Sequence, residues 1–236
     1  MARRDAEAAK VRRMRMIIAA VLSIAAGVVV LAGLYSIYAP STDLASGDHY
    51  TRLPAAERPR RGEIVVTEYF SYGCVHCRNF DPQIEDWKSE LPDGVRFERV
   101  PVVFSGAWRA LGAAYYAAGE LDVRERNHTR LFDAIHRDGL VLQTPEALAG
   151  FFDGHGTDGE RFRRAMGSPT VTRALADATD RARTDGITSV PTLVVDGRYR
   201  LELGTLSRRE LLEAADALIA EELAARRGGA EPASGP

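Results

Sequence analysis

The stretch SYGCVHCRNF, Ser71 to Phe80, contains both cysteines of the 236-residue chain, with two residues between them. A pair with this spacing can hold a metal, attach a haem, close a small structural loop or exchange electrons with other thiols. Because the chain has no third cysteine, an intramolecular disulfide can only join Cys74 to Cys77. A loop this short removes little entropy from the unfolded chain, so a purely stabilising disulfide is disfavoured.

The residues around the pair also disfavour metal and haem. A structural zinc site needs four ligands, and the cysteines supply only two of them. His128 and His136 fall inside one expected helix, at a spacing unlike that of a zinc finger. Haem attachment requires a histidine directly after the second cysteine, but Arg78 stands there. We therefore expect no metal and no cofactor, and we expect redox chemistry of the two thiols.

The local pattern supports redox chemistry. The run EIVVTEYF at 63–70 predicts a buried strand, and a short turn leads from it to a helix that runs to about Ser89. Cys74 then lies at the helix N-terminus, where free N–H groups and the helix dipole stabilise a thiolate. His76 can add a hydrogen bond or a positive charge to the same sulfur. A stabilised thiolate favours the dithiol, so the disulfide becomes an oxidant of other proteins.

Two further features point to the same chemistry. Glu68 interrupts an apolar strand, and a buried carboxylate is costly unless it has a use. It can accept or relay the proton of Cys77; the alternative is a carboxylate at a strand end that reaches solvent. Far downstream, Val190-Pro191-Thr192 precedes a strand. A proline in that position suits a cis bond or the edge of a sheet.

The rest of the pattern predicts the order β–α–β, a helical block and β–β–α. A second strand is expected at 95–104. Helical patterns follow at 108–119, 124–137, 145–152, 159–166 and 169–185. Two short strands at 192–195 and 199–203 flank the turn signal Asp196-Gly197. A capping box of Ser207 and Glu210 then opens a last helix that ends near Arg227.

An uncharged segment near the N-terminus predicts export. Residues 16–39 form a run of 24 residues without a charge. As a helix of roughly 36 Å, this run can cross a hydrocarbon core of about 30 Å. Several lysines and arginines precede it, whereas Arg52 is the only lysine or arginine among the fifteen residues after it. The asymmetry predicts one transmembrane helix with the N-terminus in the cytoplasm. The alternative is a cleaved signal peptide that releases a soluble protein.

Charge and composition exclude one class of partner and divide the chain into segments. With 31 basic and 33 acidic side chains the formal net charge is −2, which gives no general attraction to nucleic acid. We expect a basic cytoplasmic segment at 1–15, a spacer with little structure at 40–62, a folded domain at 63–227 and a disordered tail at 228–236.

Taken together, the chain resembles the thioredoxin superfamily and, within it, the DsbA-like thiol:disulfide oxidoreductases of bacterial envelopes. The resemblance is carried by Glu68-Tyr69-Phe70-Ser71, Cys74-Val75-His76-Cys77, Phe80, Pro82 and Val190-Pro191-Thr192. It implies an α/β thioredoxin fold with a helical domain inserted at about 106–186. The N-terminal segment adds a transmembrane helix before this fold. Together they predict a location at the inner membrane with the folded domain in the periplasm, or a soluble periplasmic protein after signal cleavage.

The resemblance also implies roles for individual residues. Cys74 is expected to be the exposed nucleophile, Cys77 its buried partner, Glu68 a buried acid and Pro191 a cis-proline that faces the disulfide. We further expect an apolar surface for client proteins, formed by Val190, Tyr72 and Phe104.

The expected clients are unfolded or reduced exported proteins, and the expected source of new disulfides is a DsbB-like quinone-coupled oxidase. One departure concerns Val75, because the best-known DsbA proteins have proline there, which leaves the oxidising strength open. The alternatives are a membrane-anchored reductant, for example in cytochrome maturation, and a non-catalytic binding or chaperone module on the same fold.

Overall fold

The computed structural model of the chain describes residues 14, 16, 18, 49–54, 62–204 and 206–228. The chain divides into two compact units, Met1–Asp43 and Leu44–Pro236, and the fold described below belongs to the second. The expected membrane segment, 16–39, lies outside the described residues except at positions 16 and 18. Within the described part of the chain, no helix is long and apolar enough to cross a membrane.

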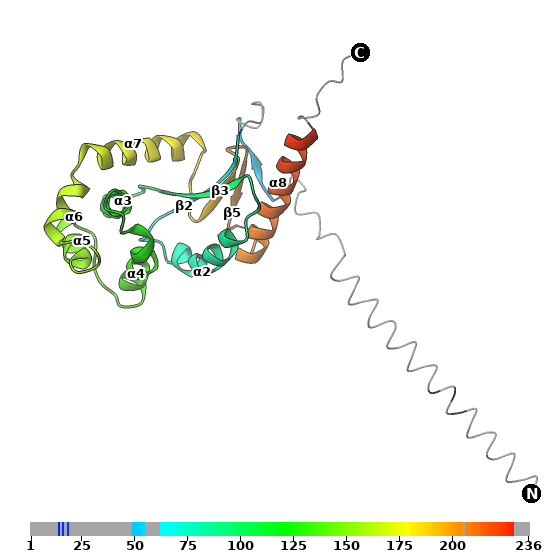
Figure 1. Ribbon diagram of the computed structural model, residues 1–236, viewed down its shortest axis with the longest axis horizontal. Coiled ribbons are helices and arrows are strands. Elements are labelled where there is room, and N and C mark those ends of the chain that lie inside the picture. The colour runs from blue at the N-terminus through cyan, green and yellow to red at the C-terminus, as the bar shows by residue number, and fades with distance from the viewer. Residues whose placement is uncertain are drawn as a thin grey trace, which may run out of the picture. The chain divides into compact units, whose positions relative to one another are not determined.

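A mixed five-stranded sheet, in the order β1-β5-β4-β2-β3, forms the centre of the described residues (Figure 1). Its strands are β1 (Thr51–Arg52), β2 (Ile64–Phe70), β3 (Val95–Pro101), β4 (Thr192–Val195) and β5 (Tyr199–Glu202). β2 pairs in parallel with β3, and the other three pairs of neighbouring strands are antiparallel. β2 is buried along almost its whole length because strands lie on both of its sides and helices cover the sheet.

Two helices cover one face of the sheet. α2 (Val75–Ser89) connects the parallel strands β2 and β3, and α8 (Arg208–Gly228) closes the fold. Their apolar side chains share one core with residues of β2, β4 and β5, including Phe80, Ile84 and Leu211. On the opposite face, Ala178 and Ala182 of α7 (Pro169–Thr184) pack with side chains of β2, β3 and β4.

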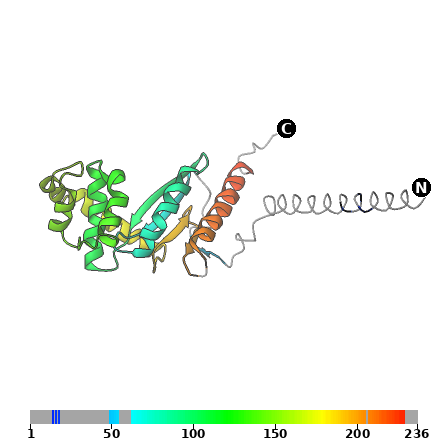
Figure 2. The same ribbon diagram turned by 90° about the horizontal axis from the view of Figure 1, so that it is seen from below.

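A helical region lies between β3 and β4 in the chain. It consists of α3 (Gly106–Glu120), α4 (Arg124–His136), α5 (Pro145–Phe152), α6 (Gly159–Met166) and α7. Figure 2 shows α3 to α6 gathered at one end of the sheet. Four of the five helices begin at a Ser, Thr or Asp whose side chain accepts a hydrogen bond from the first turn. This helix-start chemistry is local, which is why the sequence predicts these elements well.

The core of the helical region extends to the cysteines. Phe152 and Phe162 stack inside it with ring centroids 3.8 Å apart. The same cluster of buried side chains includes Cys74, Cys77 and Tyr72, which belong to the junction of β2 and α2. The two thiols are therefore held where the sheet meets the helical region.

The expectation of a spacer with little structure at 40–62 is wrong for Thr51 to Leu53. β1 pairs with β5, and the Leu53 N–H donates to the Arg198 carbonyl oxygen at 2.7 Å. Tyr50 packs edge-on against Tyr199, with ring centroids 5.1 Å apart. Two residues are too few to show the alternating pattern of a strand in the sequence. They form a strand because they pair with β5.

Candidate active site

Cys74 is the residue at which strand geometry passes into helix geometry. It is the N-cap of α2, with φ −101° and ψ 114°, and its N–H donates to the Ser71 carbonyl oxygen at 3.0 Å. Both cysteines are free thiols; Cys74 is 7% exposed and Cys77 is fully buried. The N–H groups of the first helical turn have no partner within the helix, and those of His76 and Cys77 help to stabilise a negative charge on the Cys74 sulfur.

The surroundings of Cys74 favour its thiolate. The Cys77 thiol donates a hydrogen bond to the Cys74 sulfur, and this bond is the main cause that lowers the pKa of Cys74 to about 6. Burial opposes the shift, whereas the backbone N–H groups of Cys77 and His76 and the charge of His76 assist it. Cys74 is therefore mostly ionised at neutral pH, which is the state that attacks disulfides and leaves readily from them.

Cys77 has the opposite character. Burial raises the pKa of the Cys77 thiol, and the neighbouring Cys74 sulfur and the Glu68 carboxyl raise it further. One thiol of the pair is thus ionised while the other keeps its proton. His76 and Val75 lie on the exposed side of the same turn, and Val75 is 47% exposed. Cys74 was expected to be exposed, but its side chain is largely buried in this structure, and it is only slightly more accessible than Cys77.

Glu68 lies beneath the cysteines and does not reach solvent. Its side chain is 2% exposed, and its Oε2 accepts a hydrogen bond of 2.7 Å from Arg99 Nε. The same guanidinium donates to Asp81 at 3.1 Å and to Glu85 at 2.8 Å. Burial raises the pKa of Glu68 even though Arg99 opposes the shift. A carboxyl group with a raised pKa can hold a proton close to Cys77 and release it there.

The segment before β4 lies against the active-site sulfur. The Val190-Pro191 peptide bond is cis, and Pro191 is buried. In its thiol form, Cys74 donates to the Val190 carbonyl oxygen at a sulfur–oxygen distance of 3.5 Å, across 116 residues of sequence. The structure therefore brings Val190 and Pro191 together with both cysteines and Glu68.

The two expected aromatic surface residues occupy different environments. Phe104 is 49% exposed and stacks on Trp108, with ring centroids 5.5 Å apart. Trp108 in turn lies directly against Gly73, where a Cβ atom would meet its Nε1 at 2.6 Å. Tyr72 is only 2% exposed. Its expected place on an exposed client surface does not fit this position, because the ring points into the core of the helical region.

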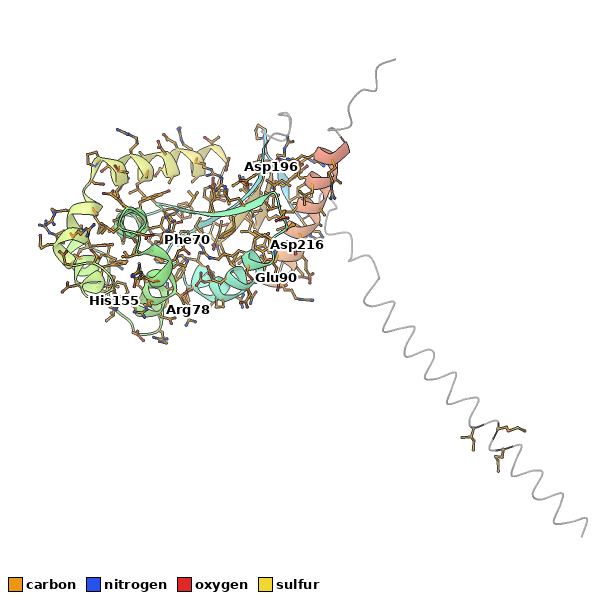
Figure 3. The ribbon with its side chains drawn as sticks, viewed as in Figure 1. Phe70, Arg78, Glu90, His155, Asp196 and Asp216 are labelled. Atoms are coloured by element: carbon orange, nitrogen blue, oxygen red, sulfur yellow. The ribbon has the colours of Figure 1, made fainter. Side chains whose placement is uncertain are left out.

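Several residues of the site were not predicted. Arg99 and Asp81 complete the buried ion cluster, and Trp108 packs beneath the turn. α4 contributes as well: Arg78 of α2 pairs with Asp133 of α4 at 2.9 Å, and Figure 3 shows Arg78 next to that helix. A signal for the cluster exists in β3, which pairs with β2: along one face of this strand Arg99 alternates with the apolar residues Phe97 and Pro101. The carboxyl groups that Arg99 contacts lie far from it in the sequence, so these ion pairs cannot be predicted from the sequence alone.

No three His, Cys, Asp or Glu side chains of the described residues come together in a group that could hold a metal ion. A mixed sheet of this topology, with a C-x-x-C pair at the start of the helix after β2 and a cis-proline opposite it, defines a thiol:disulfide oxidoreductase of the thioredoxin superfamily.

Comparison with known proteins narrows the class. Residues 94–215 match the family described as the DSBA-like thioredoxin domain, and the chain belongs to this family. The thiol:disulfide interchange protein DsbA of Azotobacter vinelandii is 40% identical over 186 residues, which cover 78% of this chain and 87% of that protein.

Solved structures agree with the sequence relatives. The crystal structure of Pseudomonas aeruginosa DsbA matches with a TM-score of 0.72 and 36% identity, over 77% of this chain and 95% of that one. The oxidoreductase DsbA from Xylella fastidiosa matches with a TM-score of 0.70 and 35% identity, over 75% of this chain and 97% of that one.

The buried ion cluster leads to a stability prediction. Replacing Arg99 by Ala leaves the buried carboxyl groups of Glu68 and Asp81 without their cation. We expect the free energy of unfolding to fall by about 3–5 kcal/mol in denaturant titrations. Arg96→Ala on the same strand is the control; its side chain is 50% exposed, so its loss should stay within about 1 kcal/mol. Equal losses in the two variants would contradict the importance of the cluster.

Proposed function

We propose that this protein donates its Cys74–Cys77 disulfide to reduced proteins that have been exported from the cytoplasm. The observation that carries the proposal is the contrast between the two thiols. Cys74 has a pKa of about 6 at the mouth of α2, whereas the pKa of the buried Cys77 is raised. A protein that stabilises its reduced form in this way gives up its disulfide readily. The family relationship supports the same activity.

The transfer takes two exchange steps. A client thiolate attacks the Cys74 sulfur, which forms a mixed disulfide and breaks the Cys74–Cys77 bond. Cys77 leaves as a thiolate and takes up a proton, and the buried Glu68 carboxyl, whose pKa is raised, is the proposed donor. A second client thiol, after losing its proton, attacks the client sulfur of the mixed disulfide. The client disulfide forms, Cys74 leaves as a thiolate, and two electrons have passed from the client to the protein.

Client segments are proposed to bind next to Cys74 on a surface that includes Val190 and Phe104. Val190 lies against the sulfur, and Phe104 is exposed on the Trp108 ring that packs against the active-site turn. A partly apolar surface of this kind suits unfolded chains of many sequences. The competing functions, a reductant and a non-catalytic chaperone, are not favoured. The low pKa of Cys74 opposes a reductant, and the complete dithiol site opposes a chaperone.

The remaining parts of the proposal concern the rest of the chain. Residues 63–227 form the catalytic domain, with the helical insertion at about 106–186. Residues 16–39 anchor it in the inner membrane with the domain in the periplasm; the alternative is a soluble periplasmic form after signal cleavage. A DsbB-like quinone-coupled oxidase restores the disulfide. The uncharged N-terminal segment and its basic flank support the anchor.

The assignment of the two sulfurs is tested by trapping. Cys77→Ser removes the thiol that resolves mixed disulfides, so client proteins should remain linked to Cys74 and be visible on non-reducing gels. Cys74→Ser should trap none, because the fully buried Cys77 is inaccessible to clients. The reverse pattern would exchange the proposed roles.

His76 is expected to tune the oxidising strength. Its charge lowers the pKa of Cys74, so His76→Ser should raise that pKa and make the protein a weaker oxidant in equilibrium with glutathione. Gln83→Ser, at an exposed position further along α2, is the matched control and should leave the equilibrium unchanged. An unaltered equilibrium in His76→Ser would exclude His76 from the mechanism.

The anchor is tested by fractionation of cells that express the full chain. The intact protein should stay in the membrane pellet after an alkaline carbonate wash, because a spanning helix is not released by high pH. A soluble protein whose N-terminus lies near residue 40 would instead show that the segment is a cleaved signal peptide.

A further inference from the structure

α4 holds Tyr72 at two separate points. The Tyr72 hydroxyl lies 2.8 Å from His128 Nδ1, and the Tyr72 carbonyl oxygen lies 2.8 Å from His136 Nε2. Phe132, halfway between the two histidines in the sequence, packs edge-on against the Tyr72 ring with centroids 4.9 Å apart. Side chains at intervals of four residues lie on the same side of a helix. Three side chains on one face of α4 therefore all contact Tyr72, a single residue of the active-site turn.

The Tyr72 carbonyl belongs to the central peptide unit of that turn. The turn runs from Ser71 to Cys74 and is closed by the hydrogen bond from the Cys74 N–H to the Ser71 carbonyl oxygen. In the central unit, the Gly73 N–H donates to Ser71 Oγ at 3.1 Å. The carbonyl oxygen on the other side of the same unit accepts from His136, so the neutral ring must carry its hydrogen on Nε2. Side chains hold both edges of this peptide plane.

The turn does not by itself fix the orientation of the peptide between Tyr72 and Gly73. The two common turn types differ by a flip of the central peptide, and glycine at the third position is typical of the type that needs a positive φ. Gly73 occupies that third position, yet its φ is not positive in this structure. The absence of a side chain is needed for a different reason, the close approach of Trp108. Gly73 thus permits both orientations, and its neighbours select one.

We propose that His136 is a positioning residue for the redox centre. By holding the Tyr72 carbonyl oxygen, it keeps the Tyr72–Gly73 peptide in one orientation and so fixes the backbone that carries the Cys74 sulfur. His128 supports this arrangement from the other end of Tyr72. Burial keeps the pKa of Tyr72 well above its ordinary value, so the phenol retains its hydrogen and donates it to Nδ1.

The consequence concerns the thiolate. The low pKa of Cys74 depends in part on the backbone N–H groups of His76 and Cys77, which must point at the sulfur. When the central peptide is free to flip, the turn samples a second geometry, and these N–H groups are aligned for only part of the time. The reduced form of the protein then becomes less stable relative to the disulfide form. A neutral hydrogen bond of this kind corresponds to about a twofold to tenfold change in an equilibrium constant.

The test uses the full chain with three variants. His136→Leu removes the donor and keeps an apolar side chain, His136→Gln retains an N–H donor, and His155→Leu is the matched control. His155 is also a partly buried histidine of the helical region whose ring bonds a carbonyl oxygen, that of Phe151, and it lies on a different segment (Figure 3). The readouts are thiolate absorbance against pH for the reduced protein, the equilibrium with glutathione, and the free energy of unfolding.

We expect His136→Leu to raise the pKa of Cys74 and to shift the glutathione equilibrium toward the protein disulfide by about twofold to tenfold. His136→Gln should restore most of the wild-type behaviour, and His155→Leu should lower stability only. The inference is overturned if His136→Leu leaves the thiolate titration and the equilibrium unchanged, or if His155→Leu alters them equally.

The inference rests on the proposed role of Cys74, and the two can fail separately. Cys74→Ser should abolish the low-pH thiolate transition of the parent protein. Without such a transition in the parent, the role of Cys74 fails. A normal transition in the parent that His136→Leu does not move refutes the role of His136 alone.

Discussion

Arg99 places one buried cation among three carboxyl groups under the active-site helix, and the geometry above it depends on that arrangement. Glu68 and Asp81 are themselves buried, and the guanidinium of Arg99 donates a hydrogen bond to each of them. Asp81 also lies 3.1 Å from His128 Nε2 and accepts a hydrogen bond from Thr129, so the cluster reaches from β2 through α2 to α4. A buried ion cluster adds little net stability when it is complete, but it tolerates the loss of no member. It therefore specifies how these three elements meet.

The same arrangement explains why two thiols in one helical turn differ so much. Cys74 faces the free N–H groups at the start of α2, whereas Cys77 faces apolar side chains and a carboxyl group. A negative charge is stabilised in the first environment and penalised in the second. The asymmetry thus follows from the position of the pair at the strand–helix junction and from the depth at which Glu68 lies below it. The helical region takes part through α4, which touches the turn directly.

Much of this fold can be predicted from local patterns. The bounds of α5, α6 and β4 match the sequence expectation, because caps, Pro at the first helical position and turn residues are short-range signals. Cys74, Cys77 and Glu68 were recognisable because their chemistry is unusual for their places in the pattern. β3 ends at Pro101, before the expected 104. β1 and the burial of Tyr72 were not predictable, since both depend on contacts with residues more than 50 positions away in the chain.

The short strand β1 has a consequence for a protein that acts on other, reduced proteins. An uncovered sheet edge presents unpaired N–H and C=O groups to which an extended client can add as a further strand. β1 covers the edge of β5 over two residues and carries the exposed Arg52, whose guanidinium lies over the Tyr199 ring. At the opposite edge, β3 carries Arg96 and Glu98 and ends in a proline. The short strand at one edge and the charges and proline at the other make both edges poor templates for the addition of a further strand.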